Sequence, residues 1–118
     1  MPRAPASGVL SVVLCDNVLI RKLNKKYLRH DRPTDVLTFS LSDAADPQWV
    51  KEVIVSVERA VQVAGRYGQT WRRELLLYIV HGLLHVAGAK DATPGARAVM
   101  RKKEEEVLAA LDRRKLAL

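Results

Sequence analysis

Residues 79–88 read Ile-Val-His-Gly-Leu-Leu-His-Val-Ala-Gly, and this stretch holds two of the three histidines of the chain. His81 and His85 are four residues apart, so in a helix both imidazoles project from the same face. A buried imidazole needs a hydrogen-bond partner or a metal ion, and the neighbouring leucines offer neither. The stretch therefore predicts a central helix, about residues 71–87, that presents a site for a divalent ion.

A catalytic zinc ion takes three protein ligands and keeps one position for water, so the histidine pair needs a third ligand. Gly88 suits the left-handed turn that ends a helix, and it would let the chain return toward the histidines. Asp91 follows with a carboxylate that is ionised at neutral pH. The predicted ligand set is therefore His81, His85 and Asp91. His30 is a competing third ligand from a distant segment, and a pair of hydrogen-bonded, half-buried rings without metal is the alternative.

The residue next to the first histidine narrows the chemistry. Zinc proteases usually carry H-E-x-x-H, in which the Glu acts as general base, and this chain has Gly82 at that position. Peptide hydrolysis by that route is therefore disfavoured, and no general base can be named. What the pattern favours is a Lewis-acid site that lowers the pKa of its own water and neutralises an anionic substrate.

The composition indicates one small basic domain. The chain has 118 residues, 48% of them hydrophobic, which is enough for a modest core. We expect residues 1–8, rich in Pro and Ala, to be flexible and residues 9–118 to form the domain. The net charge of +7 favours polyanionic partners such as nucleic acid. The single cysteine, Cys15, excludes an internal disulfide framework and is expected in the core. With no membrane span or secretory leader, a cytosolic protein without a membrane partner is expected.

The patterns of apolar and capping residues predict an α/β (α+β) fold, with a mixed sheet of three to four strands and about four helices. Asp16, Thr70 and Thr93 each precede a helical pattern and are predicted to cap it, with Pro94 at a first helical position. The expected strands are 9–15, 35–41 and 52–57, and the expected helices are 17–28, 58–67, 71–87 and 94–115.

Two charged segments have different interpretations. Between residues 21 and 32 the chain has six basic residues and one acidic residue, Asp31. This excess of positive charge suits a surface that binds RNA, and a helix face that is merely solvated is the alternative. In the last helix, the block Arg-Lys-Lys-Glu-Glu-Glu at 101–106 is interpreted as self-compensating and structural. Met100, Val107 and Leu111 are expected to face the core there.

Three motifs, in order, resemble those of a known family. Residues 24–27 (Asn-Lys-Lys-Tyr) and 31–39 (Asp-Arg-Pro-Thr-Asp-Val-Leu-Thr-Phe) resemble the signature N-x-x-Y…D-x-P-T-D-V-L-S-F. Residues 53–56 resemble its I-V-I-S strand, residues 81–88 resemble H-G-x-L-H-L-x-G, and Met100 with Glu104 to Glu106 fits M-x-x-x-E. Over about residues 9–112 the chain thus resembles the YbeY family of bacterial rRNA-maturation endoribonucleases.

The resemblance implies a small α/β fold with a metzincin-like zinc helix and one Zn²⁺ ion per chain, bound by His81, His85 and Asp91. It also implies single-strand-specific cleavage of RNA, linked to the 3′ end of small-subunit rRNA and to ribosome quality control. Single-stranded rRNA and the ribosomal small subunit are the partners that follow from it. Whether water or the RNA 2′-hydroxyl attacks stays open, as does the oligomeric state.

The chain departs from the family in three ways. The family usually has a third histidine where this chain has Asp91, whose carboxylate is a hard ligand acceptable to zinc and leaves the site one charge less positive. The family often has Arg directly after its tyrosine, where this chain has Leu28. Arg29 is adjacent and could bind the substrate, but a shift of one residue turns a helical side chain by about 100°. Family members also generally begin with an extra strand and helix, so a truncated start or a smaller sheet is expected.

Two rival functions stay open on the sequence alone. One is a different metallohydrolase that acts on peptides or small phosphoesters, against which Gly82 argues. The other is a non-catalytic ribosome-associated protein whose basic surface binds RNA and whose metal is structural or lost. If the protein is non-catalytic, Leu28 and Asp91 are the positions whose replacement would have removed the catalytic activity.

Overall fold

Three strands and four helices make up the described part of the chain. The structure is a computed structural model, and it describes residues 8–42, 45 and 48–116. In chain order the elements are β1 (Gly8–Cys15), α1 (Asn17–Leu28), β2 (Val36–Ser40), β3 (Trp49–Ser56), α2 (Val57–Arg66), α3 (Trp71–Val86) and α4 (Pro94–Arg113). The predicted α+β class is confirmed. Residues 1–7 of the segment expected to be flexible lie outside the described residues, and Gly8 begins β1.

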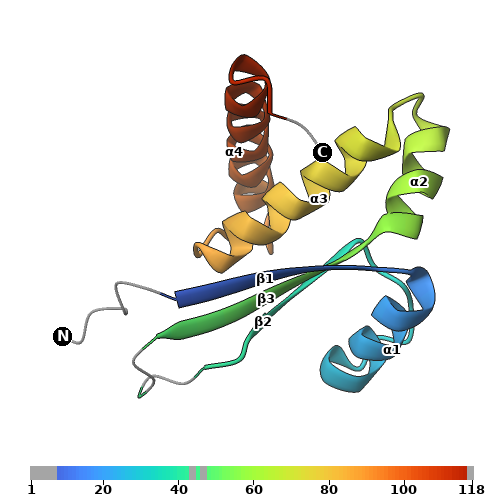
Figure 1. Cartoon of the computed structure of the whole chain (residues 1–118), viewed down its shortest axis with the longest axis vertical. Coiled ribbons are helices and arrows are strands. Elements are labelled where there is room, and N and C mark those ends of the chain that lie inside the picture. The colour runs from blue at the N-terminus through green and yellow to red at the C-terminus, as the bar shows by residue number, and fades with distance from the viewer. Residues whose placement is uncertain (1–7, 43–44, 46–47, 117–118) are drawn as a thin grey trace.

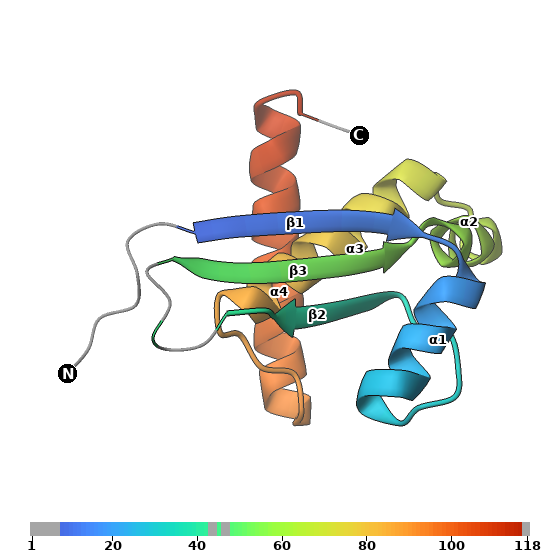
Figure 2. The same cartoon turned by 60° about the horizontal axis from the view of Figure 1, so that its bottom comes forward.

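The sheet is mixed, and β3 is its middle strand (Figure 2). β1 runs parallel to β3, with Gly8 opposite Trp49 and Cys15 opposite Ser56, whereas β2 runs antiparallel to β3. A parallel pair needs a long crossover connection, and here α1 and β2 lie between the two paired strands in the sequence. β3 starts at Trp49 instead of the predicted Glu52, because the first residues of β1 pair with Trp49 to Lys51.

Helices cover both faces of β3, which explains its continuous apolar run. Val53 and Val55 belong to a core cluster with residues of α2 and α3. Ile54 points the other way and forms a second cluster with Ile20 of α1 and Leu37 of β2. Figure 1 shows α1 on one side of the sheet and α2, α3 and α4 on the other. The strand is buried on both faces over its last four residues.

Each predicted cap lies where the sequence places it. Asp16, Thr70 and Thr93 accept hydrogen bonds from the backbone N–H three residues later, at 2.8, 3.2 and 3.1 Å. Ser56 caps α2 in the same way, with the N–H of Arg59 donating to its hydroxyl at 3.1 Å. These bonds satisfy N–H groups that have no partner inside a helix, so the helix starts are fixed by local chemistry.

A glycine lets α3 approach the sheet. A Cβ atom at Gly82 would lie 2.6 Å from Cγ1 of Val53 and 3.0 Å from Cγ2 of Val36, closer than carbon atoms pack. Position 82 therefore faces the sheet, and a Glu side chain has no space there. The missing general base next to His81 thus has a physical cause in the packing of α3 against β2 and β3.

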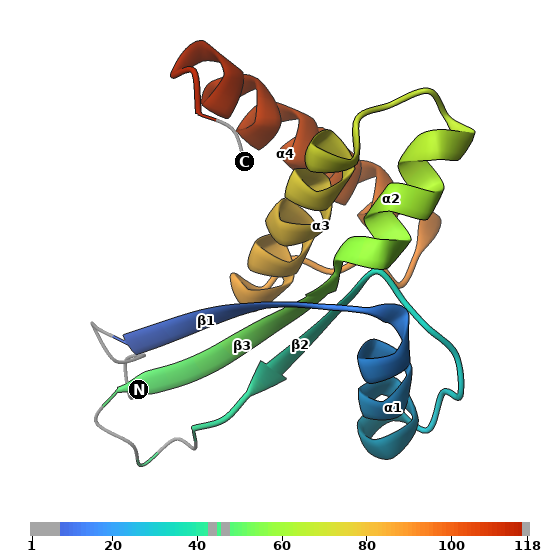
Figure 3. The same cartoon turned by 45° about the vertical axis from the view of Figure 1, so that its right-hand side comes forward.

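α4 packs against α3 (Figure 3). Met100 and Leu108 are its buried residues. The prediction that Val107 faces the core is wrong, because its side chain is 37% exposed and the neighbouring Leu108 takes the buried position. Met100 and Leu108 are eight residues apart and share a face, which also includes residue 104. Leu111 is half-buried.

β1 is an edge strand whose two faces differ. Val13 and Cys15 pack against the cluster that contains Ile20, so the expectation that Cys15 contributes to the core is confirmed. Val12 and Leu14 lie opposite Val53 and Val55 and so share their face of the sheet, yet both are exposed. No helix among the described residues is long and apolar enough to cross a membrane.

Candidate metal centre and substrate pocket

α3 ends beside the histidines in the way the sequence predicts. Gly88 has a φ of +101°, the left-handed conformation that L-residues with a side chain rarely adopt. Lys51 of β3 donates a hydrogen bond from Nζ to the carbonyl oxygen of Val86, the last residue of α3, at 3.2 Å. The helix end is thus held by the sheet, and the chain that follows it returns Asp91 to the His81–His85 face.

The three predicted ligands converge on one point. Nε2 of His85 lies 3.1 Å from Nε2 of His81 and 3.1 Å from Oδ2 of Asp91. Nε2 of His81 lies 3.4 Å from the same carboxylate oxygen. The imidazole rings are 4.6 Å apart between centroids and nearly perpendicular, at 78°. The two rings and the carboxylate therefore form one triangle of donor atoms.

This triangle has the dimensions of a tetrahedral metal site. Zinc binds imidazole nitrogen at 2.0–2.1 Å, and bonds of that length at tetrahedral angles separate neighbouring ligand atoms by about 3.3 Å. The separations of 3.1, 3.1 and 3.4 Å match that value. All three side chains are partly exposed, so a fourth ligand from solvent or substrate can reach the point. His81, His85 and Asp91 are thus a group that can hold a metal ion.

A fourth side chain contacts the site from α4. Oε1 of Glu104 lies 3.1 Å from Nδ1 of His81, on the edge of the ring away from the ligand triangle. The Glu104 side chain is only 14% exposed. An ionised carboxylate can only accept, so this contact is a hydrogen bond in the tautomer that carries the ring proton on Nδ1. The sequence interpretation of residues 101–106 as a self-compensating structural block is wrong for Glu104, which contacts His81.

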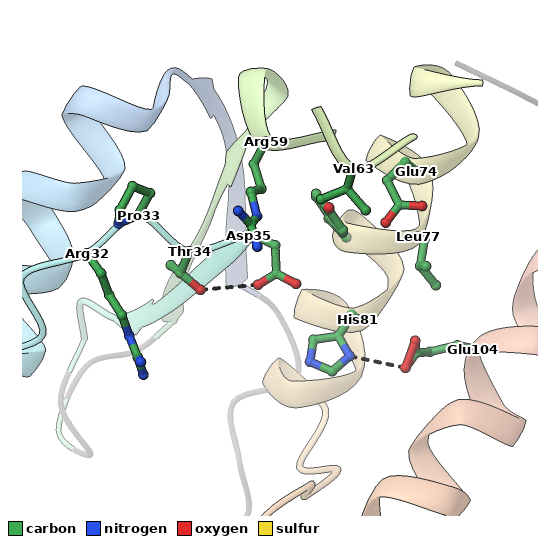
Figure 4. A pocket seen from close by; sticks show the side chains of 11 residues that line it. Arg32, Pro33, Thr34, Asp35, Arg59, Val63, Glu74, Leu77, His81 and Glu104 are labelled. Carbon is green, nitrogen blue, oxygen red and sulfur yellow. Dashed lines mark hydrogen bonds and ion pairs between the residues drawn. The ribbon is translucent and has the colours of Figure 1, made fainter. Parts of the chain in front are cut away.

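A pocket of about 540 Å³ opens next to His81 (Figure 4). One wall comes from the loop before β2, one from α2 and one from α3, and Glu104 closes the side of α4. Arg32 and Arg59 contribute two guanidinium groups. The same lining includes the carboxylates of Asp35, Glu74 and Glu104, so the two guanidinium groups lie among acidic groups. The lining residues are Arg32, Pro33, Thr34, Asp35, Arg59, Val63, Glu74, Leu77, Tyr78, His81 and Glu104.

Buried polar groups hold the loop that carries Arg32 and Asp35. Asn24 is 3% exposed, and its Nδ2 donates to the carbonyl oxygen of Arg32 at 2.9 Å. Oδ1 of Asp35 accepts from the backbone N–H of Val36 at 2.8 Å and from the hydroxyl of Thr34 at 3.2 Å. The asparagine of the N-x-x-Y motif thus has a structural task, which is to fix the pocket loop against α1.

Tyr78 presents a neutral phenol to the pocket. Burial raises the pKa of its hydroxyl far above the usual value of a tyrosine, and the Glu74 carboxylate raises the pKa further by its charge and a hydrogen bond. The phenol therefore stays protonated throughout the physiological range, and Tyr78 does not serve as a base there.

The other predicted residues lie outside the ligand triangle. Arg29 is the C-cap of α1, with a left-handed φ of 59°, and it does not line the pocket that contains His81. Its predicted substrate-binding role stays a prediction. Leu28 is exposed, and so is His30, which is not part of the His81–His85–Asp91 group.

The basic face of α1 adjoins the pocket. Arg21, Lys22 and Lys25 line a second pocket of about 380 Å³, and Pro33 lines both pockets. Asp31 pairs with Arg21 at 2.8 Å and approaches Lys25 to 3.9 Å. The Arg21 guanidinium holds the pKa of the Asp31 carboxyl below its usual range, so the pair stays ionised. The basic groups of α1 thus line a pocket that shares Pro33 with the pocket at His81.

Sequence reasoning missed Glu104 and Arg59. Both belong to helices other than the one that carries the histidines, and Glu104 meets a residue 23 positions away. The M-x-x-x-E match, counted from Met100, ends on Glu104, but it gave this residue no contact with His81.

A small α+β fold with two helical histidines and a carboxylate around one point, beside a pocket that contains two guanidinium groups, defines a class of proteins with a candidate metal centre. Comparison with known proteins makes the class specific. The sequence model of the family described as Endoribonuclease YbeY matches residues 3–112. This chain belongs to the YbeY endoribonuclease family.

Individual proteins of the same family are similar to this chain over most of its length. The Endoribonuclease YbeY of Carboxydothermus hydrogenoformans is 41% identical over 105 residues, which cover 89% of this chain and 73% of the relative. That of Salinibacter ruber is 40% identical over 109 residues, covering 86% of this chain and 69% of the relative. A solution structure of a Thermotoga maritima protein is 29% identical and has a TM-score of 0.57, with 92% of this chain and 73% of that one covered.

Proposed function

We propose that this chain is a zinc-dependent endoribonuclease that cleaves single-stranded precursor rRNA near the 3′ end of the small-subunit rRNA. The convergence of His81, His85 and Asp91 at separations that suit a tetrahedral ion is the observation that carries the proposal. Membership of an endoribonuclease family supplies the reaction class. The pocket with Arg32 and Arg59 beside His81 supplies a place for the RNA phosphates.

The donor set favours zinc over harder cations. Two imidazole nitrogens and one carboxylate oxygen are a known combination for catalytic zinc, and three protein ligands leave one position open. Magnesium and calcium prefer sets made of oxygen atoms. The bound ion would neutralise charge on the scissile phosphate and lower the pKa of a coordinated water molecule.

The residues of the chain would bind the ion and the RNA. His81, His85 and Asp91 would hold the ion, and Arg32 and Arg59 would bind phosphate oxygens in the adjoining pocket. The basic face of α1 would hold the flanking nucleotides through their backbone, without reading their sequence. A place on the ribosomal small subunit and a part in its quality control belong to the same proposal, as does a cytoplasmic location.

Metal content is the first test. Elemental analysis of the purified protein should give one zinc ion per chain. His85→Ala should lose the ion, whereas His30→Ala should keep it because His30 lies outside the ligand triangle. A wild-type protein that carries no transition metal and takes none up would refute the proposed function.

Cleavage is the second test. The metal-loaded protein should cut single-stranded fragments of precursor rRNA and leave the matching duplex intact, and His85→Ala should abolish cutting. If His85→Ala cuts as well as the wild type, the site is wrongly assigned. Cleavage of peptides without cleavage of RNA would favour a different metallohydrolase, and RNA binding without any cleavage would favour a non-catalytic protein.

A further inference from the structure

We propose that Glu104 is a positioning residue of the metal centre, whose carboxylate holds the His81 ring in the one tautomer that can bind the ion. The inference rests on the proposed function and extends it to a residue outside the ligand set. It is carried by the contact of 3.1 Å between Oε1 of Glu104 and Nδ1 of His81, and by the placement of Glu104 on a different helix from the ligands.

The hydrogen bond selects the tautomer. A neutral imidazole carries its proton on either Nδ1 or Nε2, and only the other nitrogen has a lone pair for a metal. A carboxylate next to Nδ1 accepts a hydrogen bond from the N–H there, which keeps the proton on Nδ1 and leaves the lone pair on Nε2. Nε2 is the atom that faces His85 and Asp91, at 3.1 and 3.4 Å. Glu104 therefore presets the nitrogen that points into the ligand triangle.

Packing keeps the carboxylate in place. Met100 and Leu108 lie four residues before and after Glu104, on the same face of α4, and both are buried. The Glu104 side chain is largely shielded from water, so its charge needs a hydrogen-bond donor. Among the described residues, the hydrogen-bond partner that the structure gives it is His81. A carboxylate on a freely moving surface side chain would not fix a ring orientation, whereas Glu104 lies between two buried positions of α4 and is itself 14% exposed.

Glu104 is not itself the catalytic base. It lines the pocket, but it meets the Nδ1 edge of His81, and the ligand triangle lies on the Nε2 edge of the same ring. The ring stands between the carboxylate and the point at which the three ligand atoms converge. Glu104 therefore acts through His81.

The test measures zinc affinity by competition with a chromophoric chelator, in wild type and in three variants. Loss of an outer carboxylate of this kind typically weakens metal binding about 10–100-fold. We expect that loss for Glu104→Ala and a smaller one for Glu104→Gln, which keeps the shape and an acceptor but not the charge. Glu106→Ala is the matched control, because Glu106 is exposed on the same helix and its replacement removes the same charge. It should bind zinc within about twofold of wild type.

A second readout separates positioning from a structural role. Two-bond ¹H–¹⁵N spectra of the metal-free protein should show His81 with its proton on Nδ1 in wild type and in Glu106→Ala, and a mixture of tautomers in Glu104→Ala. Thermal unfolding of the metal-free variants reports whether α4 stays docked, and Glu104→Gln keeps the test valid if Glu104→Ala does not fold.

The outcomes are distinct. Zinc affinities of Glu104→Ala and Glu104→Gln within twofold of wild type would overturn the inference while leaving the proposed function intact. An equal loss of zinc affinity in Glu106→Ala would also overturn the inference, because the loss would then follow from the change in net charge and not from the contact with His81. A wild-type protein that binds no zinc at all would instead refute the proposed function.

Discussion

The close approach of α3 to the sheet predicts that Gly82→Ala destabilises the protein. The added methyl group would lie 2.6 Å from Cγ1 of Val53 and 3.0 Å from Cγ2 of Val36, where carbon atoms need roughly 3.5–4.0 Å. Val53 is fully buried, and its β-branched side chain has little rotamer freedom. Either Val53 must leave its rotamer or α3 must move away from the sheet.

The magnitude follows from two opposing effects. Overpacking of a core by one methyl group costs about 1–3 kcal/mol, and replacing a helical glycine by alanine returns roughly 0.5–1 kcal/mol. The net loss in the free energy of unfolding should therefore be about 0–2.5 kcal/mol, with the middle of the range at roughly 1 kcal/mol. At this chain length, 1 kcal/mol corresponds to about 4 °C in Tm.

Gly65→Ala is the matched control, because Gly65 is a helical residue of α2 with no atom within 4 Å of an added Cβ. Urea unfolding should therefore show opposite signs, with Gly65→Ala more stable than wild type and Gly82→Ala less stable. In a Val53→Ala background, Gly82→Ala should lose most of its cost, because the nearest methyl group is gone and only Cγ2 of Val36, at 3.0 Å, still lies too close. If Gly82→Ala is as stable as Gly65→Ala, the close packing of α3 on Val53 is not what the structure describes.

Three further predictions concern other parts of the fold. Asn24→Ala should cost about 1–3 kcal/mol in urea unfolding, because the carbonyl of Arg32 loses its buried donor; an unchanged midpoint would contradict the role of Asn24 in holding the pocket loop. Leu14→Lys should change the free energy of unfolding by less than about 0.5 kcal/mol, whereas Val13→Lys, on the packed face of the same strand, should cost several times more; equal costs would contradict the assignment of faces. Burial raises the pKa of the Cys15 thiol, so less thiolate is present at any given pH; its alkylation by iodoacetamide should rise at higher pH than that of glutathione, and coinciding profiles would refute this.

Local chemistry made the helix starts predictable. Asp16, Thr70 and Thr93 each cap a helix through a contact that spans three residues, so the sequence contains both partners side by side. The proximity of His81, His85 and Asp91 was predictable for the same reason, since one helical turn and the turn at Gly88 bring them together. Their role as metal ligands stays a prediction.

Long-range packing was not predictable in the same way. The start of β3 at Trp49 depends on pairing with β1, which precedes it by some forty positions. The choice of Leu108 over Val107 depends on the angle at which α4 meets α3, and neighbouring apolar residues do not encode that angle. Glu104 was taken for one member of a surface charge block, because its contact with His81 exists only once α3 and α4 are packed.

The parallel pairing of β1 with β3 has a consequence for protein synthesis. β1 leaves the ribosome first, and Trp49, the partner of Gly8, is added 41 residues later. At a translation rate of about 5–20 residues per second, β1 waits on the order of 2–8 s for its neighbour. During that delay the nascent chain presents an unpaired, Val- and Leu-rich strand, which is the kind of segment that holdase chaperones bind. The yield of native protein should therefore depend more on chaperone supply during translation than its small size would suggest.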